Sequence, residues 1–191
     1  MLRFHTAGRI TWARGRSCAL LIIALGAATG TPTRAQTQNK PVPPVAAAAL
    51  QKLLPAVDGW ANGASRADLV ELSPDAKYSF ASVALTKDAF RVKLQLADSG
   101  FHPDVLLVIA TMVATMPEGY SGEASGATIK RTVIADSPAA ESWHAQNGTG
   151  EITVVVGGRF VASVEASKAD GLDTLRAILA KVDFKALAAL K

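Results

Sequence analysis

The stretch GEITVVVGGRFVASVEASKADGLDTLRAILAKVDF, residues 150–184, predicts a β-hairpin followed by a helix. Apolar and polar residues alternate on both sides of Gly157-Gly158, which permits the positive φ angles of a two-residue turn. Asp170 is predicted to cap the helix that follows. The apolar residues of this helix recur at helical spacing, at Leu172, Leu175, Ile178, Leu179 and Val182. The stretch therefore predicts a ββα unit, and it contains no nucleophile motif, metal cluster or phosphate-binding loop.

A second hairpin is predicted upstream, with strands over 78–86 and 90–96 joined across Lys87-Asp88. In its second strand the apolar residues Phe90, Val92, Leu94 and Leu96 alternate with Arg91, Lys93 and Gln95, so one face of the sheet should meet water. The remaining pattern predicts strands over 68–72 and 127–135, a short strand around Tyr120, and helices over 46–54, 137–146 and 184–190.

Hairpin connections dominate this pattern, and no long βαβ crossover is seen. The predicted fold class is therefore α+β, an antiparallel sheet with helices packed on it. At an offset of 70 residues, one set of apolar positions falls on another, namely Phe90, Val92, Leu94, Leu96, Val105 and Ile109 on Phe160, Ala162, Val164, Ala166, Leu175 and Leu179. This offset indicates either a ββα duplication or the shared pattern of any two such units, and both alternatives stay open.

Residues 1–35 have the pattern of a secretory signal peptide. Four arginines precede the uncharged run 19–30, and Thr33-Arg34-Ala35 follows as a cleavage site. A membrane anchor is the alternative, but the run is shorter than the roughly 20 residues that span a bilayer. Cys18 lies at the start of this run, so it does not form a lipoprotein signal. Residues 36–44 are then predicted to be a flexible linker, and 45–191 a single domain.

The leader accounts for the basic character of the chain. It contains five of the 20 lysines and arginines and no acidic residue, which leaves 15 basic against 16 acidic residues from Gln36 onward. A nearly neutral mature chain argues against a nucleic-acid partner. The one cysteine also belongs to the leader, so the mature protein is predicted to lack disulfides. A bacterial periplasm, or secretion, is the predicted destination.

The most unusual segment is the predicted helix over 104–116, because 105–116 carries no charge. Such a helix is either buried on both sides or exposes one apolar side as a groove for a ligand or partner. The second alternative makes Val105, Val108, Met112 and Met116 the predicted ligand-binding residues. The expected partner is then an unidentified protein or an apolar small ligand in the cell envelope.

Two histidines follow the leader, and each has an acidic neighbour. His102 lies near Asp98 and Asp104, a set that suits either a loop metal site or a helix cap, of which the cap is preferred. His144 follows Glu141 by three residues, which on a helix would bring both to one face, but a carboxylate-bridged metal site needs a second such pair. No metal, cofactor or catalytic residue is therefore predicted.

Two further features carry alternatives. Trp60, after the turn at Asp58-Gly59, is either a lid on the core or a residue that stacks on a ligand, and the lid is preferred. A basic strip on the water-facing side of the sheet would form if the strands of Arg91, Lys93, Lys130 and Arg131 were neighbours. An ordinary solvated strand face is the alternative.

Two segments carry a resemblance to known proteins. Residues 54–60, LPAVDGW, and 150–160, GEITVVVGGRF, resemble those of uncharacterised secreted bacterial proteins, and the order of elements is similar to the PsbP/Mog1-like sandwich. The resemblance implies an exported protein with an antiparallel sheet, and it supplies no catalytic residue. The expected function is a periplasmic, non-enzymatic binding or accessory domain. The alternative is a periplasmic hydrolase that uses dispersed carboxylates and His102.

Overall fold

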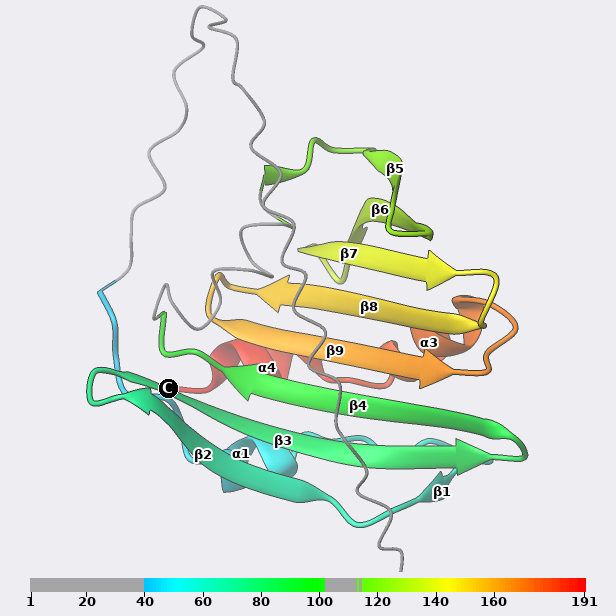
Figure 1. Ribbon diagram of the computed structural model, residues 1–191. Helices are drawn as coiled ribbons and strands as arrows, with labels where there is room; N and C mark the ends of the chain where they lie inside the picture. The colour runs from blue at the N-terminus through cyan, green and yellow to red at the C-terminus, as the bar shows by residue number, and fades with distance from the viewer. Residues whose placement is uncertain (1–39, 102–112, 114) are drawn as a thin grey trace, which may run out of the picture. The chain divides into compact units, whose positions relative to one another are not determined.

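Nine antiparallel strands form one sheet in the computed structural model, which describes residues 40–101, 113 and 115–191. These residues belong to the unit Gln38–Lys191. The strand order is β1-β3-β4-β9-β8-β7-β6-β5, with β2 also paired to β3 (Figure 1). The strands are β1 (Ala61–Asn62), β2 (Arg66–Ser73), β3 (Ala76–Lys87), β4 (Phe90–Asp98), β5 (Ser121–Ala124), β6 (Ala127–Ile134), β7 (Ser137–His144), β8 (Thr149–Val156) and β9 (Phe160–Ser167).

Three helices of the described ranges lie on one face of this sheet, which we call the helix-covered face (Figure 1). They are α1 (Ala47–Gln51), α3 (Asp173–Leu179) and α4 (Phe184–Ala189). Helix α1 packs on β2 and β3, α3 on β8 and β9, and α4 on β8. The predicted α+β class with an antiparallel sheet is confirmed. The predicted signal peptide, and most of the predicted helix over 104–116, lie outside the described residues.

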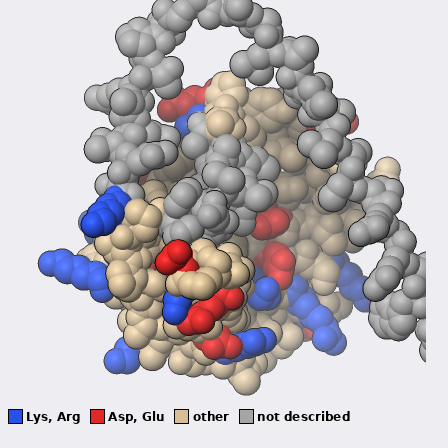
Figure 2. Space-filling view, turned by 60° about the vertical axis from the view of Figure 1, so that its left-hand side comes forward, with Lys and Arg blue, Asp and Glu red and all other residues tan. Residues whose placement is uncertain are grey.

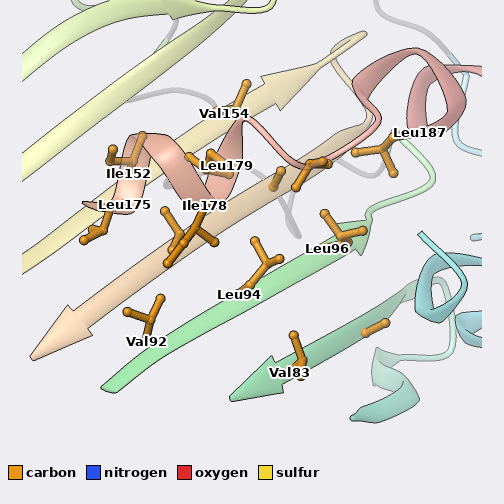
Figure 3. Close-up of a cluster of buried hydrophobic side chains, with 14 of the residues drawn as sticks. Val83, Val92, Leu94, Leu96, Ile152, Val154, Leu175, Ile178, Leu179 and Leu187 are labelled. Carbon is orange, nitrogen blue, oxygen red and sulfur yellow. The ribbon is translucent and has the colours of Figure 1, made fainter. Parts of the chain in front are cut away.

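The hydrophobic core lies between the sheet and these helices. In Figure 3 the side chains of Leu175, Ile178 and Leu179 from α3 lie against Ile152 and Val154 of β8, with Val92, Leu94 and Leu96 of β4 alongside. All eight side chains are buried. The alternation of apolar residues along each strand explains this arrangement, since it directs every second side chain to the same face.

The predicted hairpin of 150–184 is confirmed, with two corrections. Gly157 and Gly158 do adopt φ angles of 60° and 67°, but Val156 pairs with Phe160, so three residues form the loop, the third being Arg159. Asp170 does not cap the helix, because α3 begins at Asp173 with Leu172 as its N-cap. The hairpin of β3 and β4 is confirmed with a shifted turn, because Lys87 belongs to β3 and pairs with Phe90, which leaves Asp88 and Ala89 as the two turn residues in place of Lys87-Asp88.

The predicted helix over 137–146 is wrong, because Ser137–His144 is strand β7. The strand lies between β6 and β8 and pairs with both. Ala139 is buried on the helix-covered face, and Ala140 packs on the opposite side with Val113 and Val155. Burial on both faces stabilises the strand more than the helix propensity of alanine and glutamate favours a helix.

The two strands of the candidate duplication are neighbours. In the β4–β9 ladder Leu94 lies opposite Val164, and these two residues are 70 positions apart. A two-fold relation between the hairpins would produce this register, and the three-residue loop at Arg159 would account for a one-residue offset in their outer strands. The duplication itself stays a prediction.

Candidate functional site

The face of the sheet opposite the helices carries a groove that we call the open-face groove. Strands β4, β9, β8 and β7 line it, and its volume is about 460 Å³. Its lining residues are Arg91, Val92, Lys93, Ser142, His144, Thr149, Gly150, Glu151, Glu165, Ala166 and Ser167.

Two rows of polar side chains cross this groove from strand to strand. In the first row Lys93 lies opposite Glu165, Glu165 opposite Glu151, and Glu151 opposite Ser142. Lys93 Nζ lies 3.2 Å from Glu165 Oε1, and Glu151 Oε1 accepts a hydrogen bond of 3.1 Å from Thr153 Oγ1. The second row contains Arg91 opposite Ser167 on one side and His144 opposite Thr149 on the other. The groove therefore has basic side chains on β4 and acidic side chains on β9 and β8, at positions that the sheet register fixes.

A second groove, the Trp60 groove, lies on the helix-covered face between the α1–β1 loop, the β3–β4 turn and α3. Its volume is about 560 Å³. Its lining residues are Val57, Asp58, Trp60, Lys87, Asp88, Phe90, Asp170, Thr174, Ala177, Ile178 and Lys181. The side chains of Val57 and Ile178 are buried, those of Trp60 and Phe90 are partly buried, and the charged residues are exposed.

The position of Trp60 fits the role of a lid on the core, and the role of stacking on a ligand stays a prediction. The side chain of Trp60 is partly buried and packs against the core cluster, as expected of a lid. The same residue also lines the Trp60 groove, and within the described residues its indole N–H has no hydrogen-bond acceptor. A partly exposed tryptophan with an unused donor is suited to a ligand that has an apolar face and a polar edge.

Asp98 belongs to a buried ion pair, and its oxygens are occupied. Arg159 Nε donates to Asp98 Oδ1 at 2.8 Å, and Arg159 Nη2 donates to Oδ2 at 2.7 Å. The backbone N–H groups of Val45 and Gly100 donate to the same carboxylate at 2.7 and 2.8 Å. Because its oxygens already accept these hydrogen bonds, Asp98 is not free to act as a ligand in the metal site considered above. The other two residues of that site, His102 and Asp104, lie outside the described residues.

Glu141 also belongs to an ion pair, with Arg176 of α3. Arg176 Nε and Nη2 donate to its two oxygens at 2.7 and 2.6 Å, and Nη1 donates to Asp173 at 2.6 Å. The hydrogen bonds to Glu141 raise the pKa of Arg176 above its usual value, so the guanidinium stays charged. Because β7 is a strand, Glu141 faces α3 whereas His144 faces the open-face groove, and the helical Glu141–His144 pair is absent.

The predicted basic strip does not form. Arg91 and Lys93 lie on β4, and three strands separate β4 from β6, which carries Lys130 and Arg131. These last two residues are consecutive on a strand, so they point to opposite faces. Basic and acidic side chains are intermixed on the face that Figure 2 displays. Arg91 and Lys93 are exposed on β4, and Glu165 of β9 is exposed opposite Lys93, so this strand face is solvated and of mixed charge.

Of the four residues predicted to bind an apolar ligand, only Met116 is described; Val105, Val108 and Met112 lie outside the described residues. Met116 is partly buried and packs against Val113, Ala140 and Val155 on the face opposite the helices. Its carbonyl oxygen accepts a hydrogen bond from Arg131 Nη1. Val113 and Met116 therefore pack against the sheet at the C-terminal end of the predicted helix over 104–116. The apolar groove along that helix stays a prediction.

Sequence reasoning missed both grooves, although one signal for the open-face groove was present. Glu151 on β8 and Glu165 on β9 occupy the water-facing positions of a hairpin that the sequence does predict. Neighbouring strands bring such positions together. The Trp60 groove had no comparable signal, since it joins three segments that are distant in sequence.

Within the described ranges, no group of three or more His, Cys, Asp or Glu side chains is arranged to hold a metal ion. The helices in that part of the chain are too short or too polar to cross a membrane. No protein-family model, curated protein or solved structure matches this chain. The resemblances to secreted bacterial proteins and to the PsbP/Mog1-like layout therefore stay predictions.

Proposed function

We propose that this protein is an exported, non-catalytic binding domain that takes its ligand in the Trp60 groove. The observation that carries the proposal is that two partly buried aromatic residues, Trp60 and Phe90, line one groove together with the buried apolar side chains of Val57 and Ile178. Small-molecule sites have this composition, with an apolar lining and a few polar groups that orient the ligand. The signal-like leader supports an address in the cell envelope.

The ligand that fits this groove best is a sugar ring. The C–H face of such a ring stacks on an aromatic side chain, and its hydroxyl groups need hydrogen-bond acceptors at the edge. Asp58, Asp88 and Asp170 line the groove and provide carboxylate acceptors, and Thr174 adds a hydroxyl. An unidentified apolar ligand would use the rings and the floor, but it would leave these polar groups without a partner.

A non-catalytic role is supported by the polar groups of the two grooves. Among the described residues, neither Ser142, Ser167 nor His144 is hydrogen-bonded to a group that would activate it as a nucleophile or base. The Asp98 and Glu141 carboxylates are each committed to an arginine. The hydrolase alternative would have to use the exposed carboxylates at the groove rims.

Tryptophan fluorescence tests the proposal, because Trp60 and Trp143 are the two tryptophans that follow residue 35. The Trp143→Phe variant retains Trp60 as the reporter, and Trp60→Phe retains Trp143, which lines neither groove. Titration with cellotriose and with an N-acetylglucosamine trimer should shift the emission of Trp143→Phe and leave that of Trp60→Phe unchanged.

The same titration followed by calorimetry should show at least about tenfold weaker binding for Trp60→Ala, equivalent to about 1.4 kcal/mol. The matched control is Trp143→Ala, which should bind like the unchanged protein. Equal emission shifts in both single-tryptophan variants, or no heat of binding at millimolar sugar, would contradict the proposal. Shortened oligosaccharides after prolonged incubation would favour the hydrolase alternative.

A further inference from the structure

The open-face groove contains one cation and one anion that have no ionic partner among the described residues. Arg91 forms no ion pair there, and Glu151 interacts only with the hydroxyl of Thr153. Lys93 and Glu165, by contrast, neutralise each other across β4 and β9. Arg91 and Glu151 are therefore the charges that a ligand can satisfy.

The sheet register fixes the distance between the Cα atoms of Arg91 and Glu151. Strand β9 lies between β4 and β8, and Arg91 lies one polar row beyond Glu151. With strands about 4.8 Å apart and about 6.7 Å between alternate residues, the two Cα atoms are roughly 12 Å apart. A peptide of two or three residues spans roughly 7 to 10 Å from end to end. The side chains of Arg91 and Glu151 can bridge the difference.

The arrangement of charge selects a ligand with both signs. A phosphate or other dianion would be repelled by the unpaired Glu151, and a polyamine would be repelled by the unpaired Arg91. Like charges that face each other across a ladder destabilise a sheet, and Glu151 lies directly opposite Glu165. A ligand ammonium beside Glu151 would relieve that repulsion.

We infer that the open-face groove binds a short peptide with free termini. Its carboxylate pairs with Arg91, whose planar guanidinium suits bidentate carboxylate binding, and its ammonium pairs with Glu151. Ser142, His144 and Ser167 line the groove beside these charges and provide hydrogen bonds for the peptide backbone. This site is independent of the Trp60 groove, because the two grooves lie on opposite faces of the sheet.

The test uses trialanine, trialanine amide and N-acetyl-trialanine as probes, with binding to the purified protein measured by calorimetry. Each terminal cap should weaken binding about tenfold, and so should Arg91→Gln and Glu151→Gln with uncapped trialanine. Each substitution should also abolish the effect of one particular cap, because both remove the same ionic contact. Arg91→Gln should not distinguish trialanine from its amide, and Glu151→Gln should not distinguish trialanine from its acetylated form.

Lys77→Gln and Glu71→Gln are matched controls, since this ion pair is exposed on β2 and β3 and lines neither groove. Both should bind trialanine like the unchanged protein. Binding that is insensitive to both caps would overturn the inference. It would also be overturned if each cap weakened binding to its matched variant by the same factor as binding to the unchanged protein. Binding of inorganic phosphate or spermidine at the affinity of trialanine would also overturn it. Loss of sugar binding alone would leave this site intact and count against the Trp60 groove only.

Discussion

Asp98 and Arg159 are 61 positions apart in the sequence and form a bidentate ion pair where the end of β4 lies beside the start of its neighbour β9. The side chain of Asp98 is fully buried, and that of Arg159 is 11% exposed. The guanidinium also lies over the rings of Phe101 and Phe160, at 5.5 and 4.8 Å from their centroids. Ser99 donates its backbone N–H and its hydroxyl to the Arg159 carbonyl, so the two chain segments are joined at several atoms.

Replacing Arg159 by Ala should reduce the free energy of unfolding by about 3 to 5 kcal/mol, because a buried carboxylate is left without its counter-charge. Urea denaturation followed by circular dichroism measures this change. The matched control is Arg66→Ala, which breaks an exposed pair with Asp68 whose side chains are 74% and 53% exposed. That variant should lose less than about 1 kcal/mol. Similar losses in the two variants would show that Asp98 is satisfied without the arginine.

Arg176 provides an internal comparison, since one guanidinium contacts two carboxylates of different exposure. The side chain of Glu141 is 6% exposed, and that of Asp173 is 97% exposed. Arg176→Met should therefore cost about 2 kcal/mol, through the unpaired Glu141, while Asp173→Asn should change stability by less than about 0.5 kcal/mol. Urea denaturation of both variants gives the comparison. A larger loss for Asp173→Asn would contradict the assignment of Glu141 as the structural partner.

The sequence predicts the hairpins because each is a local pattern. In β8 and β9 the apolar alternation and Gly157-Gly158 lie within one short stretch, and the same holds for the alternation after Lys87-Asp88. The pairing of Asp98 with Arg159 is not local, because it requires β4 to lie beside β9. Nothing in the alternation of either strand identifies its partner outside its own hairpin.

Strand β7 was missed for a different physical reason. The turn before it uses Ala135 and Asp136 at φ angles of 48° and 59°, positions that Gly or Asn normally occupies. The residues that follow, Ala139 to Glu141, favour helices when considered alone. Their burial between β6 and β8 decides the conformation, and a single sequence does not show which strands will flank a segment.

Residues 1–35 are predicted to be removed when the protein is exported. If residues 1–35 are a cleaved signal peptide, the mature protein begins at Gln36 and contains no cysteine. Intact-mass measurement on protein released from the periplasm should give the mass of 36–191, and a reducing agent should leave the melting temperature unchanged. Recovery of the uncut chain from the membrane fraction would support an anchor instead.

Gly100 helps to hold the segment before α1 beside the Asp98–Arg159 pair. Val42 donates its backbone N–H to the Gly100 carbonyl at 2.8 Å, and Val45 donates to Asp98 at 2.7 Å. Gly100 has a φ of +58°, and an added Cβ would lie 2.0 Å from the Val42 carbonyl oxygen. Gly100→Ala therefore combines a left-handed backbone with a backbone clash.

Gly157→Ala separates these two effects, since Gly157 has a φ of +60° and nothing within 4 Å of its added Cβ. That control should cost about 1 to 2 kcal/mol, the price of a left-handed residue other than glycine. Gly100→Ala should cost at least about 1 kcal/mol more. It should also speed proteolysis at Lys40 or Lys52, because the displaced segment loses its bonds to Gly100 and Asp98. Equal stability losses with unchanged cleavage would show that the contact between Val42 and Gly100 contributes little to holding this segment in place.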